Sequence, residues 1–498
     1  MLRICFFISC LSLVAKVSAG QDDPEISRLK SLPGHMKPFG SEGPFFHVPI
    51  VEGFPTTYDF FNNYVIPSIP VVMKGAAKIS PAFKKWTDEY FIKHKDASEK
   101  VYAEARKKED RTIPGSFLSF RTFVKQYIKH DIYMVNGVPM FLRRDVLLPP
   151  PLNCEKVKKN LADTVMWFSS GGTKSVLHND DVDNINCLYR GNKTLTFVSP
   201  FQTDEDWVAS VIDHPEGTYS DIDVDAVDYV KYRKLSDINY GVVQMKEGDC
   251  LFIPYKWAHQ VNSYGNNLAV NIWFNHLPNN FRNLTPADCG DQSVDATLDR
   301  VKFETTDQYS GSTPQQKPIF DKDYSPDKKE HEAKTESTEE IKEEEKEEGE
   351  EGGEEETPLI AAVFQAFGQK SSIDIEDLKA GILMMQPSTF QSWDDACENT
   401  LNTIYSNMDL NGDNQLNVAD HDLFKHKHQE EQYEIMQDVD DYYQALAQAL
   451  YNAQLVAERV MIRKLIQNGQ VEMDMAKNIY GEKFVADIKP VAAAKEEL

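Results

Sequence analysis

The chain has 498 residues, of which 41% are hydrophobic, and it carries 53 lysines and arginines against 79 aspartates and glutamates, a net charge of −26. This length can bury large cores and is typical of roughly two to four domains. The acidic balance argues against nucleic acid as a partner, because the phosphates would be repelled.

The first twenty residues have the pattern of a secretory signal peptide. Arg3 gives a positive start, ICFFISCLSLV is an apolar run, and small residues up to Ala19 offer a cleavage site near Gly20. The run is well short of the roughly 20 apolar residues that span a bilayer. We therefore expect a cleaved leader over 1–20 and no membrane span.

Residues 21–300 have the pattern of a mainly β domain with flanking helices. Short apolar or β-branched runs such as TVMWFSSGG, NINCLYRGNKTLTFVSP and NLAVNIWFNH alternate with Gly, Pro and Asn turns. AFKKWTDEYFIKH has helical character and lies outside these runs. Five widely spaced cysteines remain after the leader, and their connectivity cannot be read from the sequence. Two glycosylation sequons begin at Asn192 and Asn283.

The stretch SVLHNDDVDN places His178 and Asp180 two positions apart near a strand end. Side chains at i and i+2 project from the same face of a strand, so these two could share one ion. Two imidazoles and a carboxylate on one face are the ligand set of non-haem Fe(II) oxygenases. His259, in GDCLFIPYKWAHQV, is the best third ligand, and polar residues at a strand end are the alternative explanation. The i+2 geometry favours Asp180 and leaves Asp181 and Asp183 as loop charge.

The surrounding sequence resembles the JmjC, or cupin-like, group of Fe(II)/2-oxoglutarate dioxygenases, specifically hydroxylases related to the asparaginyl hydroxylase of the hypoxia-inducible factor. The resemblance rests on HNDDVDNINCLYRGNKTLTFVSP, GDCLFIPYKWAHQV and LAVNIWF, and it covers about residues 44–276. It implies a double-stranded β-helix, that is, a jelly-roll or cupin-like barrel. It also implies that His178, Asp180 and His259 bind iron.

The same resemblance implies a site for 2-oxoglutarate. Lys193, fifteen residues after His178, matches the basic residue that pairs with the distal carboxylate of this cosubstrate. A buried dicarboxylate needs such a cation to offset its desolvation. Asn184 and Asn271 match asparagines that line the cosubstrate end of the pocket, and Ser175 falls where the family often has a hydroxyl that contacts the carboxylate.

The reaction implied by the family uses dioxygen, converts 2-oxoglutarate to succinate and carbon dioxide, and hydroxylates a C–H bond of the substrate. A luminal or secretory protein is the expected substrate, and an oligomer is compatible with the resemblance because some members are dimers. Residues 201–240 read as an insertion that either shapes the substrate cleft or covers the barrel.

Residues 301–357 are predicted to be an acidic, disordered linker. Between residues 327 and 356, sixteen acidic residues outnumber five lysines. Such a segment cannot bury enough apolar surface to become ordered. A low-affinity calcium buffer is the alternative function for this stretch.

Residues 358–490 show helical periodicity and are predicted to form a small all-α EF-hand domain. Residues 409–420 read as a twelve-residue calcium loop, in which hard oxygen ligands recur at alternate positions. The candidate ligands are Asp409, Asn411, Asp413, Gln415 (through its carbonyl), Asn417 and Asp420.

This loop departs from the EF-hand pattern in two places. Asn414 replaces glycine at the sixth position, where asparagine tolerates a positive φ. Asp420 replaces glutamate at the twelfth position, which suggests weaker calcium binding or a shift toward magnesium. Residues 366–382 look like a degenerate, metal-free partner loop.

The last residues, KEEL over 495–498, resemble an endoplasmic reticulum retrieval signal. Together with the leader they predict residence in the lumen of the endoplasmic reticulum. The leading hypothesis is therefore a luminal Fe(II)/2-oxoglutarate-dependent protein hydroxylase with a calcium-binding region. The alternatives are a catalytically inactive calcium-binding or chaperone-like protein and, disfavoured by compartment and charge, a histone demethylase.

Overall fold

The computed structural model describes residues 23–108, 115–202, 211–212, 219–282, 284–290, 295–304, 360, 363, 371–385 and 392–489. The predicted signal peptide, residues 305–357 of the predicted linker, the predicted retrieval tail and the sequon residue Asn283 lie outside these residues. None of the described helices is both long enough and apolar enough to cross a membrane.

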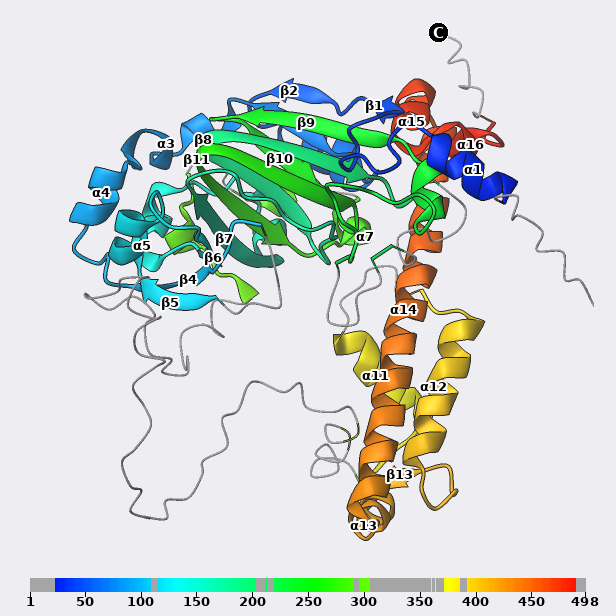
Figure 1. Ribbon diagram of the computed structural model, residues 1–498. Coiled ribbons are helices and arrows are strands. Elements are labelled where there is room, and N and C mark those ends of the chain that lie inside the picture. The colour runs from blue at the N-terminus through cyan, green and yellow to red at the C-terminus, as the bar shows by residue number, and fades with distance from the viewer. Residues whose placement is uncertain are drawn as a thin grey trace, which may run out of the picture.

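A large mixed β-sheet forms the body of the first part of the chain (Figure 1). Its strands are β1 (Phe45–Phe46), β2 (Ile50–Glu52), β3 (Val71–Lys74), β4 (Lys100–Glu104), β5 (Ser116–Ser119), β6 (Tyr133–Gly137), β7 (Leu161–Ser169), β8 (Asp183–Val198), β9 (Tyr240–Lys246), β10 (Cys250–Ile253) and β11 (Ala258–Phe274). The main path runs β2-β3-β10-β8-β11-β7-β6-β4-β5, and β9 joins β1 and β8. This arrangement is consistent with the cupin-like, jelly-roll fold that the resemblance implies.

The two longest strands, β8 and β11, pair with each other along most of their length, from Ala258 opposite Val198 to Phe274 opposite Asp183. Successive side chains of a strand point to opposite faces. Near the start of β8, Asn184 and Asn186 therefore line a pocket, whereas the residues between and after them pack into the main hydrophobic core. This alternation separates the polar interior of the barrel from its apolar surroundings.

Short helices flank the sheet. They are α1 (Pro24–Ser31), α2 (Thr57–Phe60), α3 (Ala82–Lys85), α4 (Asp88–Lys93), α5 (Phe120–Gln126), α6 (Glu155–Lys158), α7 (Pro278–Phe281) and α8 (Pro286–Cys289). The stretch predicted as helical, AFKKWTDEYFIKH, forms two helices, α3 and α4, instead of one. Thr87 divides them because its backbone is extended and its side chain accepts from the N–H of Tyr90, which caps the start of α4.

Residues 211–212 and 219–240 of the insertion contribute to a hydrophobic cluster, here called the insertion cluster. Insertion residues such as Ile222 and Leu235 meet Leu177 and Ala258, both of which are fully buried. Leu177 and Ala258 directly precede the two predicted histidine ligands in the sequence. Of the two roles left open for the insertion, this packing supports covering the barrel.

The C-terminal part of the chain is helical and contains α11 (Ile375–Met385), α12 (Asp395–Met408), α13 (Val418–Lys425) and α14 (Gln429–Gln467). A two-stranded pair, β12 (Ser372–Ile373) with β13 (Leu416–Asn417), links the two loops predicted from the sequence. The first half of α14 packs with α11 and α12 around a core that includes Leu401, Ile404 and Leu446.

Helix α14 belongs to two hydrophobic cores, and this departs from the predicted division of the chain. Its second half, with α15 (Met473–Tyr480) and α16 (Glu482–Val485), packs on the sheet (Figure 1). Ile462 and Ile466 share a cluster there with Trp257 of the barrel. Residues 358–490 therefore do not form one separate unit, because helical periodicity does not reveal which neighbour a helix contacts.

Two disulfides join residues far apart in the sequence. Cys187 on β8 is bonded to Cys250 on β10, where the two residues are opposite each other in register. Cys154 is bonded to Cys289 at the end of α8. Cys397 is buried and has a free thiol. Four of the five cysteines are therefore paired.

Candidate active site

Two histidines are held together by a pair of backbone hydrogen bonds. The N–H of His178 donates to the carbonyl of His259 at 3.1 Å, and the N–H of His259 donates to the carbonyl of His178 at 2.7 Å. The centroids of their rings lie 4.2 Å apart. Strand pairing thus brings together two residues that are 81 positions apart in the sequence.

Backbone carbonyls orient both rings. The Nδ1 atoms of His178 and His259 each lie 2.9 Å from the carbonyl oxygen two residues earlier, that of Val176 and of Trp257. A carbonyl oxygen only accepts, so Nδ1 carries the proton and Nε2 keeps its lone pair. Burial, with a further contribution from His178, lowers the pKa of His259 to about 4, so this ring is neutral at physiological pH. A neutral imidazole oriented in this way is suited to binding a metal ion.

Asp180 completes a group of three possible ligands. Its Oδ2 lies 3.9 Å from Nε2 of His259, and one donor atom from each of the three residues lies within 4.8 Å of the others. The side-chain amide of Asn184 donates to the same oxygen at 3.3 Å. Within the described part of the chain, no other group of three His, Cys, Asp or Glu side chains meets this spacing. The donor set matches the two-histidine, one-carboxylate arrangement that holds non-haem Fe(II).

The other two aspartates of the stretch have different partners. Asp181 is exposed and forms an ion pair with Lys256. Asp183 is fully buried, and its Oδ2 lies 2.8 Å from Nδ1 of His276. The prediction that Asp183 is loop charge is therefore wrong, because the side chain turns inward at the start of β8.

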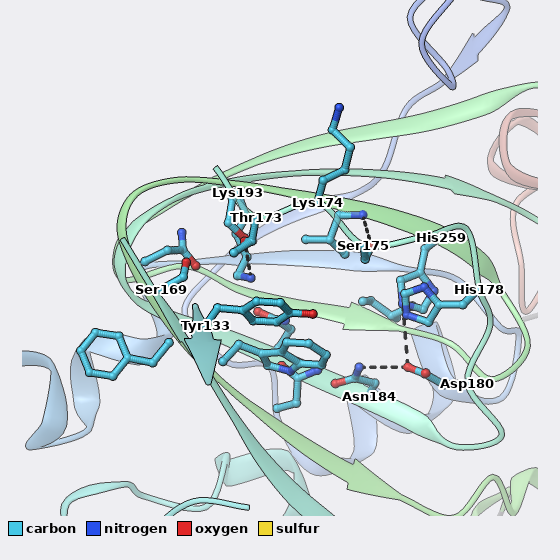
Figure 2. Close-up of a pocket in the computed structure, with 18 of the residues that line it drawn as sticks. Tyr133, Ser169, Thr173, Lys174, Ser175, His178, Asp180, Asn184, Lys193 and His259 are labelled. Carbon is cyan, nitrogen blue, oxygen red and sulfur yellow. Dashed lines mark hydrogen bonds and ion pairs between the residues drawn. The ribbon is translucent and has the colours of Figure 1, made fainter. Parts of the chain in front are cut away.

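The three possible ligands lie at one end of a pocket, and Lys193 lies toward the other (Figure 2). The empty volume is about 650 Å³, including space open to solvent. The Lys193 ammonium donates to Ser263 Oγ at 3.1 Å, and no carboxylate of the described residues pairs with it. Burial lowers the pKa of Lys193 to about 8.

Several polar atoms in the pocket are buried and have no hydrogen-bond partner among the described residues. They include Oδ1 of Asn184, Oδ1 of Asn271 and Nε1 of Trp273. Such atoms are costly in a protein interior unless water or a ligand satisfies them. Together with the buried ammonium of Lys193, they fit a small ligand that is polar and anionic. The residues present therefore fit both iron and 2-oxoglutarate.

Ser175 lines the same pocket, but its hydroxyl already accepts from the backbone N–H of Val261 at 2.8 Å. It can still donate a hydrogen bond. Further residues that were not predicted line the pocket, among them Tyr133, Trp167, Thr173, Asn186, Ser263 and Trp273. Of these six, Asn186 and Trp273 carried a usable signal, since each lies two residues after a predicted pocket residue on the same strand.

The predicted calcium loop folds around the side chain of Asp409. Its carboxylate accepts from the N–H groups of Gly412, Asp413 and Asn414 at 2.8–3.2 Å. Asn414 has a φ of 62°, in agreement with the prediction that it tolerates a positive φ. Asp420 is fully buried and accepts from the N–H groups of Asn411 and Asn417.

The remaining predicted ligands also bond within the loop. Asn411 donates to Asp413, and Asn417 donates to the carbonyl of Gln415. The three aspartates are not among the described side chains that come together as a group able to hold a metal ion. Leu416 pairs with Ile373, which connects this loop to the predicted degenerate partner. The loop is thus closed by its own backbone amides.

Comparison with known proteins shows what the first part of the chain is similar to. Residues 57–280 match the profile of the cupin-like domain. The chain is 28% identical over 283 residues to the tRNA wybutosine-synthesizing protein 5 of Gallus gallus, a match that covers 51% of this chain and 82% of that protein. It is 24% identical over 267 residues to the human bifunctional peptidase and (3S)-lysyl hydroxylase JMJD7, which covers 46% and 84%.

A third relative is the lysine-specific demethylase 8 of Xenopus tropicalis, 23% identical over 233 residues. The chain spans about half of that protein, 51%, and 44% of the chain is matched. Residues 57–280 are thus similar to the cupin-like domain, and the similar proteins carry the names of demethylases and of a lysyl hydroxylase.

Proposed function

We propose that this chain is an Fe(II)/2-oxoglutarate-dependent oxygenase that hydroxylates a protein side chain. The observation that carries the proposal is the pocket with His178, Asp180 and His259 at one end and the buried Lys193 at the other. A binding protein with no reaction to perform would have little use for a buried cation that lacks a carboxylate partner. A 2-oxo dicarboxylate supplies that partner and reaches toward a metal.

In this proposal His178, Asp180 and His259 hold the iron, and Lys193 pairs with the distal carboxylate of 2-oxoglutarate. When bound, iron and 2-oxoglutarate supply the oxidation of a C–H bond by dioxygen, with loss of carbon dioxide. The carbonyls of Val176 and Trp257 aim both imidazoles, and burial keeps the imidazole of His259 neutral. Asn184 orients Asp180, and the buried amide and indole groups without a partner in the described part of the chain offer hydrogen bonds to a bound ligand.

The test is 2-oxoglutarate turnover by anaerobically iron-loaded protein, measured as succinate after oxygen is admitted. Wild type should produce succinate, and His178→Ala and Lys193→Met should not. Lys246→Met is the matched control, because this exposed lysine lies on the neighbouring strand β9. Absence of succinate from iron-loaded wild type across a range of peptides would refute the proposal.

We propose a protein as the substrate. One relative is named for lysyl hydroxylation, which agrees with this proposal, whereas another is named for tRNA modification. The net charge of −26 favours a protein over a polyanion. Mass spectrometry of co-purifying proteins should find +16 Da shifts that disappear with His178→Ala. Modified RNA bases that depend on His178 would favour the nucleic acid instead.

We further propose that the protein resides in the lumen of the endoplasmic reticulum. The predicted leader and the KEEL tail motivate this, and the two disulfides support it because such bonds persist in oxidising compartments. Deletion of residues 495–498 should release the protein into the medium. A full-length chain found in the cytosol with four reduced cysteines would contradict the proposal.

We propose that the loop over 409–420 binds calcium. Its alternate oxygen side chains and the positive φ of Asn414 support this. The second candidate function, an inactive calcium-binding or chaperone-like protein, is favoured by this loop alone. The two are separated by the turnover assay, since the inactive protein would bind calcium but give no succinate.

A further inference from the structure

Behind the candidate metal site lies a second cluster of buried ionisable groups, made of Asp183, His276 and Glu458. Their side chains are 0%, 5% and 2% exposed. Nδ1 of His276 lies 2.8 Å from Asp183 Oδ2, and its Nε2 lies 3.6 Å from Glu458 Oε1, an ion-pair distance longer than a hydrogen bond. The imidazole thus lies between two carboxylates. Glu458 comes from α14, outside the matched cupin-like region of 57–280.

Asp183 connects this cluster to the pocket. Its second carboxylate oxygen accepts from the N–H of Tyr255 at 2.9 Å, and the ring of Tyr255 stacks on His276 at 4.6 Å with an angle of 6° between the planes. The next N–H in the chain, that of Lys256, donates to the carbonyl of Asp180 at 3.0 Å. The turn over 254–257 therefore rests on the cluster on one side and on a candidate ligand on the other.

The same turn leads into β11 and the second histidine. Trp257, its last residue, provides the carbonyl that orients the ring of His259. A shift of the turn would move this carbonyl and the contact to Asp180 together. Two of the three candidate ligands thus depend on where the turn lies.

One face of α14 contacts this turn. Tyr451, Gln454 and Glu458 are spaced so that they lie along the same side of a helix. Gln454 accepts from the hydroxyl of Tyr255 at 3.2 Å, and the ammonium of Lys256 lies 4.7 Å from the centroid of the Tyr451 ring. The C-terminal helix is therefore part of the wall behind the pocket.

We propose that Glu458 is a positioning residue of the candidate metal site, which acts through His276 and Asp183 to fix the turn over 254–257. The inference rests on the metal centre of the proposed function. Loss of Glu458 removes the carboxylate on the second side of the imidazole, so the ring is held by Asp183 alone and the turn that stacks on it is less firmly fixed. Burial favours the neutral form of His276, but the two carboxylates outweigh it and raise its pKa to about 10.

The first measurement is the affinity of the full chain for Co(II), by calorimetry, in wild type and in Glu458→Gln. We expect affinity to fall about tenfold, at the lower end of what loss of an outer-shell contact costs. Glu434→Gln, which removes an exposed charge from the same helix, should leave affinity unchanged. In a His276→Gln background, Glu458→Gln should have no further effect, because its route to the site is already broken.

The second measurement is amide hydrogen exchange of the metal-free chain. The N–H groups of Tyr255 and Lys256 should exchange faster in Glu458→Gln and, to a smaller extent, in Gln454→Ala. A folded Glu458→Gln protein with wild-type metal affinity and wild-type exchange at both amides overturns the inference. If that variant does not fold, unchanged affinity and exchange in Gln454→Ala overturn it. If the wild type binds no metal, the proposed function is refuted. The exchange rates of Tyr255 and Lys256 would still show whether Glu458 fixes the turn.

Discussion

Two buried basic groups differ in their partners: Lys193 in the candidate pocket has no carboxylate of the described residues beside it, whereas His276 behind the pocket lies between two. Lys193 is held by one neutral hydroxyl, and burial lowers its pKa to about 8. Burial also disfavours a charge on His276, but Asp183 and Glu458 reverse this and raise its pKa to about 10. An interior cation without a carboxylate is costly, whereas one between two carboxylates is matched. The contrast indicates that Lys193 serves a ligand and that His276 serves the structure.

The largest effect should come from removing the matched cation. His276→Gln leaves the carboxylates of Asp183 and Glu458 buried without their partner, so the free energy of unfolding should fall by about 3–5 kcal/mol. Urea unfolding followed by circular dichroism measures this. His428→Gln, at an exposed position before α14, should change stability little. A His276→Gln protein as stable as wild type would break the comparison.

The opposite result is expected for the unmatched cation. Lys193→Met should reduce affinity for 2-oxoglutarate about a hundredfold, because a charge-assisted contact worth about 1.5–3 kcal/mol is lost. The ligand-free protein should at the same time become more stable, by about 1–3 kcal/mol, since a buried charge is removed. Calorimetry and urea unfolding of the same preparation test both signs. If Lys193→Met is less stable than wild type, the Lys193 ammonium must already have a compensating partner in the ligand-free protein.

The pH dependence should separate the two groups as well. Binding of a dicarboxylate needs charged Lys193, so affinity should be constant below pH 8 and fall about tenfold per pH unit above it. In the ligand-free chain, Lys193 has a lower pKa folded than unfolded, so its effect on stability improves as pH rises from about 8 toward its ordinary value. His276 has a raised pKa, so its contribution is complete below its ordinary value near 6.5 and is lost as pH rises through about 10.

Lys193→Met should remove the pH dependence of 2-oxoglutarate affinity, and His276→Gln should remove the loss of stability at high pH. The affinity profile of Lys193→Met should be flat across pH 8. The stability of His276→Gln should no longer decrease between neutral pH and pH 10. An affinity profile that keeps its break near pH 8 in Lys193→Met would assign the titration to another group.

The smallest change in stability is expected for the loop over 409–420, where Asp409 and Asp420 accept hydrogen bonds from backbone N–H groups. Calcium at tenfold its dissociation constant should stabilise the wild type by about 1.4 kcal/mol. Asp409→Ala should abolish this gain, because its carboxylate meets three N–H groups of the loop. Calorimetric titration with calcium and with magnesium checks the result. An unchanged isotherm in Asp409→Ala would refute the calcium proposal.

The residues of the pocket that could be predicted from the sequence lie in short motifs. His178 and Asp180 share one strand end, and Lys193 follows at a fixed spacing on the paired strand β8. His259 was found because it lies in a second motif, and the structure shows why it is close: its backbone pairs with that of His178. Tyr133 was missed because β6 reaches the pocket only through its pairing with β7.

The polar cluster behind the pocket could not be predicted. Asp183 and Glu458 are 275 positions apart, and neither has a local pattern that distinguishes it from a surface acid. The disulfide between Cys187 and Cys250 likewise depends on the register of β8 against β10, which spacing alone does not give. Periodicity predicted α14 as a helix, but its two sets of neighbours depend on tertiary packing.

Because α14 is one continuous helix, a small tilt at one end becomes a large displacement at the other. Its 39 residues span about 58 Å at the usual rise per residue. A tilt of about 5° at the sheet would displace the far end by about 5 Å, while the contacts of Glu458 would move by only a fraction of that. Distances between labels on α13 and on the sheet therefore magnify any adjustment of the turn beside the pocket and offer a sensitive way to observe it.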